Sequence, residues 1–235
     1  MGLFELFAGR LSVRESKVLQ GKVDRHSHIL FGVDDGIRTI EDSLQAIALH
    51  ETLGITDLWC TPHIMEDVPN TTPGLQARFE ELRQAYKGGV RLHLAAEYMM
   101  DNLLEERIEG RDLLTMEDNM LLLETSTLNP PYGYKEILRK IMSAGYRPLL
   151  AHPERYRYMS DDDYAELRKM GVLFQLNLPS VLGYYGKTVQ QKADELLEKG
   201  YYDYLGSDCH RTKALLEPFD RKLLSRSTFK RLKDL

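Results

Sequence analysis

The stretch Lys22–Gly36, KVDRHSHILFGVDDG, is the part of the chain from which the fold and the chemistry can first be inferred. We expect a strand over about residues 22–29 that carries His26 and His28, followed by an acidic turn that contains Asp35. Alternate residues of an extended strand point to the same face, so the two imidazoles can bind one metal ion. A lone His-x-His sequence is more often two exposed histidines. The metal interpretation therefore depends on similar residues recurring later in the chain.

The size and composition of the chain are those of an ordinary globular protein. It has 235 residues, of which 29% are charged and 43% hydrophobic, and α/β barrels often have this length. We assign residues 22–235 to one domain and residues 1–21 to an N-terminal leader that lies on it. The net charge of −5 disfavours nucleic acid as the main partner.

The cysteine count and the apolar runs predict a cellular location. Cys60 and Cys209 are the two cysteines, too few for a disulfide framework, and we interpret both as packing residues. The first residues lack the apolar core of a signal peptide, and no run approaches the ~18 apolar residues that cross a bilayer. We expect reduced thiols, a cytoplasmic location and no membrane insertion.

Helices, glycines, apolar strands and polar strand ends alternate along the chain. Strands are expected over about residues 22–29, 55–63, 90–98, 120–126, 146–155, 172–180 and 201–210. Helices are expected over about 39–53, 75–86, 101–109, 134–144, 161–170 and 187–199, with a loop over 64–74 and a basic terminal helix over 214–235. About seven such units predict an α/β fold with a parallel sheet, closed or nearly closed into a TIM-like barrel.

Side chains that bind metals recur where these strands end, which is the rim that carries the reactive groups of (β/α) barrels. The candidates are His26, His28, His63, Glu97, Glu124, His152, Asp208 and His210, with Asp35 on the first loop. Nine nitrogen and oxygen ligands are too many for one ion and suit two or three divalent ions such as Mn²⁺, Fe²⁺ or Zn²⁺. The two glutamates could instead cap a helix or pair with an arginine. We interpret His50 and His93, which lie in a helix and mid-strand, as structural.

Seven short motifs, in order and in register, resemble one known family. They are Asp24-x-His26-Ser27-His28, Asp35-Gly36, Thr61-Pro62-His63, Ala96-Glu97, Leu123-Glu124, Ala151-His152-Pro153-Glu154-Arg155-Tyr156 and Ser207-Asp208-x-His210. Together they are similar to the polymerase-and-histidinol-phosphatase (PHP) family, over about residues 22–220. Their spacing is most like the bacterial tyrosine-protein phosphatase branch, which is found with capsule and exopolysaccharide loci.

The resemblance implies a distorted (β/α)₇ barrel with a trinuclear site, often manganese, bound by the nine candidates. It implies that Arg155 holds the substrate phosphate, although a salt bridge with Glu154 is an alternative. It further implies that the partner is an autophosphorylating tyrosine kinase that controls polysaccharide export. We expect His210 or His63 to protonate the leaving oxygen, a role that a metal-bound imidazole cannot also fill.

Other functions are compatible with parts of this pattern. A histidinol-phosphatase or another small-molecule phosphatase would use the same metals behind a deeper rim. An amidohydrolase also begins with His-x-His but commonly uses a strand-end lysine, which is missing from the candidates. A non-catalytic domain that binds phosphotyrosine would keep the metals without turnover. The tyrosine pairs 132/134, 156/158 and 184/185 could line a peptide groove or simply pack on the surface.

Overall fold

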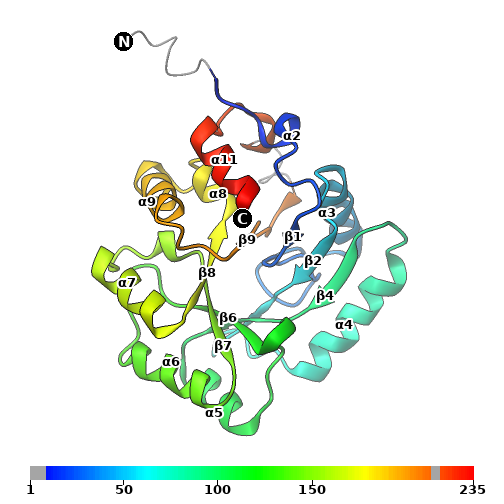
Figure 1. Cartoon of the computed structure of the whole chain (residues 1–235). Coiled ribbons are helices and arrows are strands. Elements are labelled where there is room, and N and C mark those ends of the chain that lie inside the picture. The colour runs from blue at the N-terminus through cyan, green and yellow to red at the C-terminus, as the bar shows by residue number, and fades with distance from the viewer. Residues whose placement is uncertain (1–8, 213–217) are drawn as a thin grey trace.

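A computed structural model describes residues 9–212 and 218–235 as a mixed α/β fold built on two parallel sheets (Figure 1). The first sheet has the order β1-β2-β4 and the second the order β3-β5-β6-β7-β8-β9, and every pair of neighbouring strands is parallel. The strands are β1 Val23–Asp24, β2 Asp57–Cys60, β3 His63–Ile64, β4 Arg91–Leu94, β5 Glu97–Met99, β6 Met120–Glu124, β7 Arg147–Ala151, β8 Leu173–Asn177 and β9 Tyr204–Gly206. The predicted parallel α/β architecture is confirmed.

Helices connect and cover the strands. They are α2 Val13–Ser16, α3 Ile40–Thr52, α4 Thr72–Ala85, α5 Asn102–Gly110, α6 Tyr134–Ser143, α7 Asp161–Met170, α8 Leu178–Val181, α9 Lys187–Glu198 and α11 Arg226–Asp234, with 3₁₀ turns at Glu117–Asn119 and Pro153–Arg155. Local sequence explains their ends. Ser160 and Asp163 form a capping box that begins α7, and Gly171 ends it in the left-handed conformation.

The strands read as apolar runs because both of their faces are covered. In β6, Leu121 and Leu123 pack in the large core under the helices. Met120 and Leu122 point to the other side, into a smaller core completed by residues such as Leu149. One set of alternating side chains therefore packs between the sheet and the helices. The other set packs on the opposite face of the sheet, in the smaller core.

Backbone hydrogen bonds connect the two sheets at both of their junctions. The amide of Ala95 donates to the carbonyl of Cys60 (3.0 Å), and the amide of Glu97 donates to that of Pro62 (3.0 Å). On the other side, Arg25 donates to Leu205 (3.2 Å) and His28 to Cys209 (3.0 Å). The strand ends of both sheets therefore come together at one edge.

Several local predictions are wrong. The expected loop over 64–74 contains the end of β3, and α4 begins at Thr72 because Thr71 caps it and a proline occupies its first turn. The expected strands over 55–63 and 90–98 are interrupted at residues 61–62 and 95–96. The strand over 172–180 ends at Asn177, where α8 begins with a proline in its first turn. The terminal helix is not continuous: residues 221–225 are not helical and α11 begins at Arg226, while residues 213–217 lie outside the described part.

The described part of the expected leader packs on the rest of the chain. Leu11 forms an antiparallel bridge with Leu224, and Val13, Val18 and Leu19 are buried in the large core. The assignment of residues 22–235 to one domain stays a prediction. In the described residues, no helix combines the length and apolar character needed to span a membrane.

Candidate metal centre

The two histidines of the opening stretch lie on one face, as the sequence predicts. The regular strand β1 ends at Asp24, but the chain stays extended and Ser27 forms a parallel bridge with Cys209. A carboxylate oxygen of Asp24 accepts hydrogen bonds from the amides of His26 (3.1 Å) and Ser207 (2.9 Å). The Nε2 atoms of His26 and His28 are consequently 3.1 Å apart and fully buried.

All nine predicted ligands come together at one edge of the two sheets. They fall into four groups whose potential ligand atoms lie within 4.8 Å of one another. The groups are His28, Asp35, His63 and His210; His26, His28 and Asp208; His26, Glu97 and His152; and His63, Glu97 and Glu124. Several residues belong to two groups, so the groups form one continuous centre.

Glu97, at the start of β5, is the carboxylate in the middle of this centre. Its Oε2 lies 3.1 Å from the Nε2 atoms of both His26 and His28 and 3.3 Å from Nδ1 of His63. Its Oε1 lies 3.2 Å from Nε2 of His152. One buried carboxylate thus faces four imidazoles.

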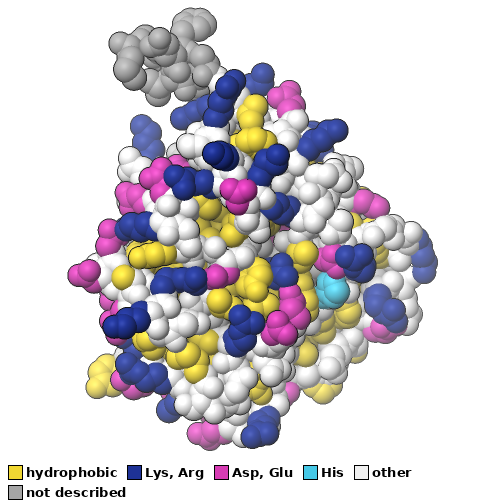
Figure 2. Space-filling model, viewed as in Figure 1, with side chains coloured by type: hydrophobic (Ala, Val, Ile, Leu, Met, Phe, Trp, Pro, Cys, Tyr) yellow, Lys and Arg dark blue, Asp and Glu magenta, His cyan; other side chains and the backbone are white. Residues whose placement is uncertain are grey.

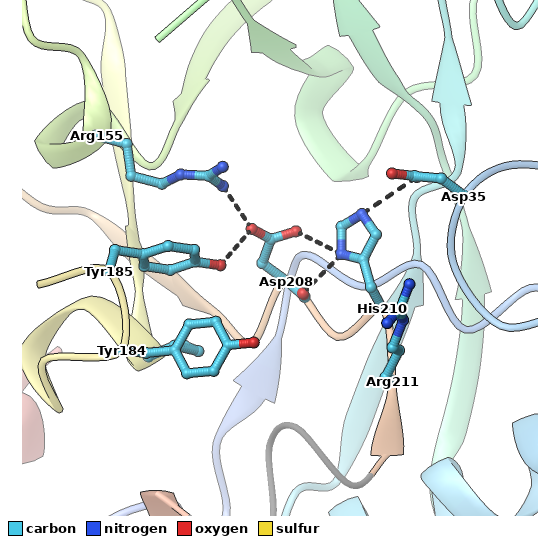
Figure 3. A pocket seen from close by; sticks show the side chains of 8 residues that line it. Asp35, Arg155, Tyr184, Tyr185, Asp208, His210 and Arg211 are labelled. Carbon is cyan, nitrogen blue, oxygen red and sulfur yellow. Dashed lines mark hydrogen bonds and ion pairs between the residues drawn. The ribbon is translucent and has the colours of Figure 1, made fainter.

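Asp208 and Asp35 form the outer side of the centre (Figure 3). Asp208 Oδ1 lies 3.5 Å from the Nε2 atoms of His26 and His28, and its Oδ2 accepts from Nη1 of Arg155 at 2.8 Å. Asp35 is 70% exposed, and its Oδ1 lies 3.3 Å from Nε2 of His210. The centre is buried on the strand side and open on the loop side.

Bound cations would fit these donors, because several buried polar atoms have close neighbours but no hydrogen bond. In the described part of the chain, His63 Nδ1, Glu97 Oε1 and His152 Nδ1 are buried without a hydrogen-bond partner. Buried polar groups are almost always paired, so each exception needs an explanation. His63 Nδ1 lies only 3.1 Å from an oxygen of Glu124, and a shared metal ion would satisfy both atoms.

The charges of the carboxylates shift the pKa values of the histidines. Burial disfavours the charged ring, but Glu97 and Asp208 outweigh this effect and raise the pKa of His26 to about 10. The same balance of burial and neighbouring carboxylates raises the pKa values of His63 and His210 to about 9. Metal ions bind the neutral imidazole, so a cation entering this centre has to displace protons.

Two of the ligands adopt backbone conformations that are uncommon for residues with a side chain. His152 has φ +36° and Asp208 has φ +52°, both in the left-handed region. His152 follows β7 directly, and Asp208 lies two residues after β9. His152 Nε2 lies 3.2 Å from Glu97, whereas Asp208 Oδ1 faces His26 and His28 at 3.5 Å.

Sequence reasoning missed the residues that orient the ligands. Asp34 accepts from Nδ1 of His28 (2.8 Å) and from the amide of His63 (3.0 Å). Gln175 Oε1 lies 2.9 Å from Nδ1 of His26, and the amide nitrogen of Asn177 donates to Asp208 (2.8 Å). The signal was present in β8, LFQLN, where two amides alternate within an otherwise apolar strand.

The remaining histidines and the cysteines lie outside the centre, as predicted. His50 is buried beneath it, where Nδ1 bonds the carbonyl of Ala46 and Nε2 approaches Asp24. His93 stacks on Trp59 at the opposite end of the strands. Cys60 and Cys209 are buried free thiols. Burial raises the pKa of Cys60 to about 12, which makes it a poor nucleophile.

A pocket of about 290 Å³ opens beside the centre (Figure 3). Its lining comprises Asp35, Arg155, Pro179, Tyr184, Tyr185, Asp208, His210 and Arg211. The alternative pairing of Arg155 with Glu154 is absent from the described ion pairs, because Arg155 faces Asp208 and lies over the ring of Tyr185, 4.6 Å from its centroid. Of the three tyrosine pairs, only Tyr184 and Tyr185 line this pocket.

Comparison with known proteins assigns the chain to a family. The family model described as capsular polysaccharide synthesis, CpsB/CapC, matches residues 22–218. The tyrosine-protein phosphatase CpsB of Streptococcus pneumoniae is 28% identical over 204 residues, covering 80% of this chain and 82% of that protein. The tyrosine-protein phosphatase YwqE of Bacillus subtilis is 26% identical over 198 residues, covering 81% and 78%.

A solved structure shares the fold. It comes from work on YwqE from Bacillus subtilis and CpsB from Streptococcus pneumoniae, described as metal-dependent tyrosine phosphatases, and it superposes with a TM-score of 0.75 at 23% identity, covering 88% of this chain and 90% of that one. The chain therefore shares its mixed α/β fold with a relative of known structure. Because the family model matches residues 22–218 of the 235, the chain belongs to the CpsB/CapC family of capsular polysaccharide synthesis.

Proposed function

We propose that this protein is a metal-dependent phosphomonoester hydrolase that removes phosphate from phosphotyrosine in proteins. The observation that carries the proposal is the position of Arg155, whose guanidinium lies 2.8 Å from one of the nine clustered ligands, Asp208, at the edge of an open pocket. Its family relatives are named tyrosine-protein phosphatases, which supports the same activity here.

We propose two or three divalent ions, most simply Mn²⁺, with Fe²⁺ or Zn²⁺ as alternatives. Glu97 belongs to two of the four ligand groups, and a shared carboxylate is the usual bridge between ions held close together. When bound, such ions stabilise the negative charge of the transferring phosphoryl group and activate the attacking water.

The side chains around the pocket would bind and orient the substrate. Arg155 presents fixed donors that match two phosphate oxygens, and Asp208 and Tyr185 hold its guanidinium in place. Tyr184 and Tyr185 form an aromatic wall at the mouth, against which the phenol ring of the substrate can pack. The leaving phenolate would then point outward, toward solvent and the rest of the peptide.

His210 and His63 are the candidate donors of a proton to the leaving oxygen. His210 lines the pocket, and a carboxylate neighbour raises its pKa to about 9 against the effect of burial, so a free ring would carry a proton at neutral pH. His63 lies deeper, beside Glu124. His210 is therefore the better placed of the two for proton transfer when it is not itself a ligand.

The open rim favours a peptide over a small substrate. Tyr184 is 53% exposed and Asp35 is 70% exposed at the mouth of the pocket. A histidinol-phosphatase would need walls that surround the whole substrate. The amidohydrolase alternative is weaker still, because no lysine of the described chain lines this pocket or joins the four ligand groups.

The wider context also remains a proposal. We infer that the substrate is an autophosphorylating tyrosine kinase of capsule or exopolysaccharide synthesis and that the enzyme acts in the cytoplasm. We further interpret the two sheets as parts of one distorted (β/α)₇ barrel, counting β2 with β3 and β4 with β5 as single interrupted strands. The hydrogen bonds from Arg25 to Leu205 and from Glu97 to Pro62 support this closure.

The deciding experiment is phosphate release from a phosphotyrosine peptide and from histidinol phosphate. Chelated protein would be assayed before and after Mn²⁺ is restored, beside His152→Ala. We expect metal-dependent turnover of the peptide that the substitution abolishes. Turnover of histidinol phosphate alone would assign a small-molecule phosphatase. Binding of phosphotyrosine without turnover by the metal-loaded protein would assign a binding domain.

A further inference from the structure

We propose that a basic surface formed by the two ends of the described chain docks on anionic phospholipid bilayers. The surface consists of residues 9–22 and 218–235, and we call it the terminal basic surface. This inference is independent of the catalytic proposal, because the surface contains none of the nine clustered ligands and none of the residues that line the catalytic pocket.

The charge of the terminal basic surface is opposite to that of the chain as a whole. Its two segments carry ten cations and three acids, although the entire chain has a net charge of −5. The cations are Arg10, Arg14, Lys17, Lys22, Arg221, Lys222, Arg226, Lys230, Arg231 and Lys233. A solvated helix face is the ordinary explanation for one basic run, but it does not explain why two runs distant in sequence coincide in space.

The fold brings the two segments together. Leu11 and Leu224 exchange backbone hydrogen bonds of 2.8 and 3.0 Å. The Nζ atom of Lys22 donates to the carbonyl of Lys233 (2.9 Å), and Nε of Arg226 donates to that of Gly9 (3.3 Å). Helices α2 and α11 lie close together in Figure 1, and dark blue side chains gather over the same region in Figure 2.

Six of the ten cations are exposed to solvent: Lys17, Arg221, Lys222, Arg226, Lys230 and Lys233. The ion pairs of the surface include Arg14 with Asp220 (2.6 Å) and Arg231 with Glu198 (3.8 Å). The six exposed cations nevertheless outnumber the three acids of the two segments.

The sequence next to the surface favours a bilayer over an acidic protein. The chain enters the surface at Gly9, directly after residues 1–8, MGLFELFA, which include four large apolar side chains. A polybasic surface beside apolar groups is the two-signal combination that holds peripheral proteins on anionic membranes. Each cation near such a membrane contributes about 1 kcal/mol, so several together give measurable binding.

The test is sedimentation of the full chain with vesicles of phosphatidylcholine, with and without phosphatidylglycerol. We expect binding only when phosphatidylglycerol is present, and weaker binding as salt is added. Reversing Lys222→Glu, Arg226→Glu and Lys230→Glu together should reduce this binding by roughly tenfold or more. Phosphate release from a soluble phosphotyrosine peptide should be unchanged in the same variant, which also shows that it is folded.

A matched control separates the surface from net charge. The variant Lys87→Glu, Arg139→Glu, Lys169→Glu reverses three exposed cations elsewhere in the chain and should bind vesicles like the unaltered protein. An equal loss in this control, or equal binding to both vesicle types, would overturn the proposal. Capture by polyglutamate without capture by vesicles would overturn it in favour of an acidic protein. Unchanged vesicle binding by the double variant Phe4→Ser, Phe7→Ser would show that the apolar residues of 1–8 do not contribute to membrane binding.

Discussion

Two clusters that contain histidine and carboxylate lie near opposite ends of β2 and β4. At the carboxyl ends, Glu97 faces four imidazoles in the candidate metal centre. At the amino ends, Asp57 of β2 faces His93 and Arg91 of the neighbouring β4, at 2.9 Å and 2.5 Å. Both clusters bring a carboxylate close to imidazole, so residue type alone does not distinguish their roles, whereas position along the strand does.

The two clusters differ in how their polar atoms are satisfied. Asp57 receives hydrogen bonds from Arg91, His93 and Thr56, so the charges and donors at the amino end are balanced within the protein. At the carboxyl end, buried atoms of His63 and Glu97 are left without hydrogen bonds. A buried histidine cluster with unpaired polar atoms favours a metal-binding role. A cluster whose polar atoms are hydrogen-bonded within the protein favours a structural role.

The largest effect that would sharpen this contrast is expected at Glu97. Glu97→Gln removes a negative charge that belongs to two of the four ligand groups. It should lower phosphate release by about 10³-fold and should also lower the metal content of the protein. Turnover and elemental analysis of the purified variant would be measured side by side. Asp57→Asn is the control at the other end and should keep both. Full metal content and activity in Glu97→Gln would remove Glu97 from the centre.

A smaller effect is expected at Arg155. Arg155→Lys keeps the charge but loses the planar donors, so kcat/KM for a phosphotyrosine peptide should fall by about 10²-fold, chiefly through KM. The bound metal should remain, because the guanidinium lies beside the ligands and is not one of them. Steady-state kinetics and metal analysis test both parts. Loss of the metal with the arginine would show that Arg155 acts through Asp208 alone.

The next effect is expected at the residues that orient the ligands. Asp34→Asn weakens the acceptor for Nδ1 of His28 and should reduce metal affinity by about 10-fold to 100-fold. Titration of chelated protein with Mn²⁺, followed by recovered activity, measures this change. Asp118→Asn, an exposed acid paired with Arg147, is the matched control and should leave the titration unaltered. Equal titrations for all three proteins would contradict an orienting role.

The smallest effect is expected at the amino ends, and it concerns stability. Burial alone would raise the pKa of Asp57, but hydrogen bonds from Arg91, His93 and Thr56 outweigh it and lower that pKa to about 2. Because an unfolded aspartate titrates near about 3.9, the carboxylate stabilises the fold above about pH 4, and this contribution is lost as the pH falls toward about 2.

Urea unfolding at several pH values measures this contribution. Asp57→Asn should lower the free energy of unfolding by about 1 kcal/mol at pH 7, and the difference from the unaltered protein should shrink between about pH 4 and 2. Phosphate release under native conditions should be unchanged. A difference that is constant with pH would show that the packing of the side chain matters and its charge does not.

The clustering of the candidate ligands could be predicted from sequence because strand ends converge in a parallel fold. His63, Glu97 and His152 are distant in the chain, and the carboxyl ends of neighbouring parallel strands necessarily bring them to one edge. Residues such as Asp34 could not be assigned in the same way. Whether Asp34 or Asp35 contacts His28 depends on how the loop turns, and the alternation of strands and helices does not determine that turn.

The interruptions of the strands also escaped prediction. Ala95 and Ala96 are compatible with a continuous strand, and the break there depends on how β4 and β5 pair with different neighbours. Asn177 and Pro179 gave a clearer signal, since a proline favours the first turn of a helix, but the apolar residues around it resembled a strand. At residues 95–96, strand propensity predicted a continuous strand that the structure does not have. At Pro179, the helix-start signal of proline was outweighed by the apolar pattern around it.

The left-handed backbone at His152 and Asp208 has a consequence for laboratory evolution. A side chain in that region costs roughly 1 kcal/mol or more, a cost that glycine avoids. Glycine at either position would relieve this strain, but it would also remove a buried side chain, and at position 208 it would leave Arg155 and Asn177 without their acceptor. Selection for heat resistance alone should therefore keep both residues in spite of their strained backbone, and stabilising substitutions should accumulate elsewhere in the chain.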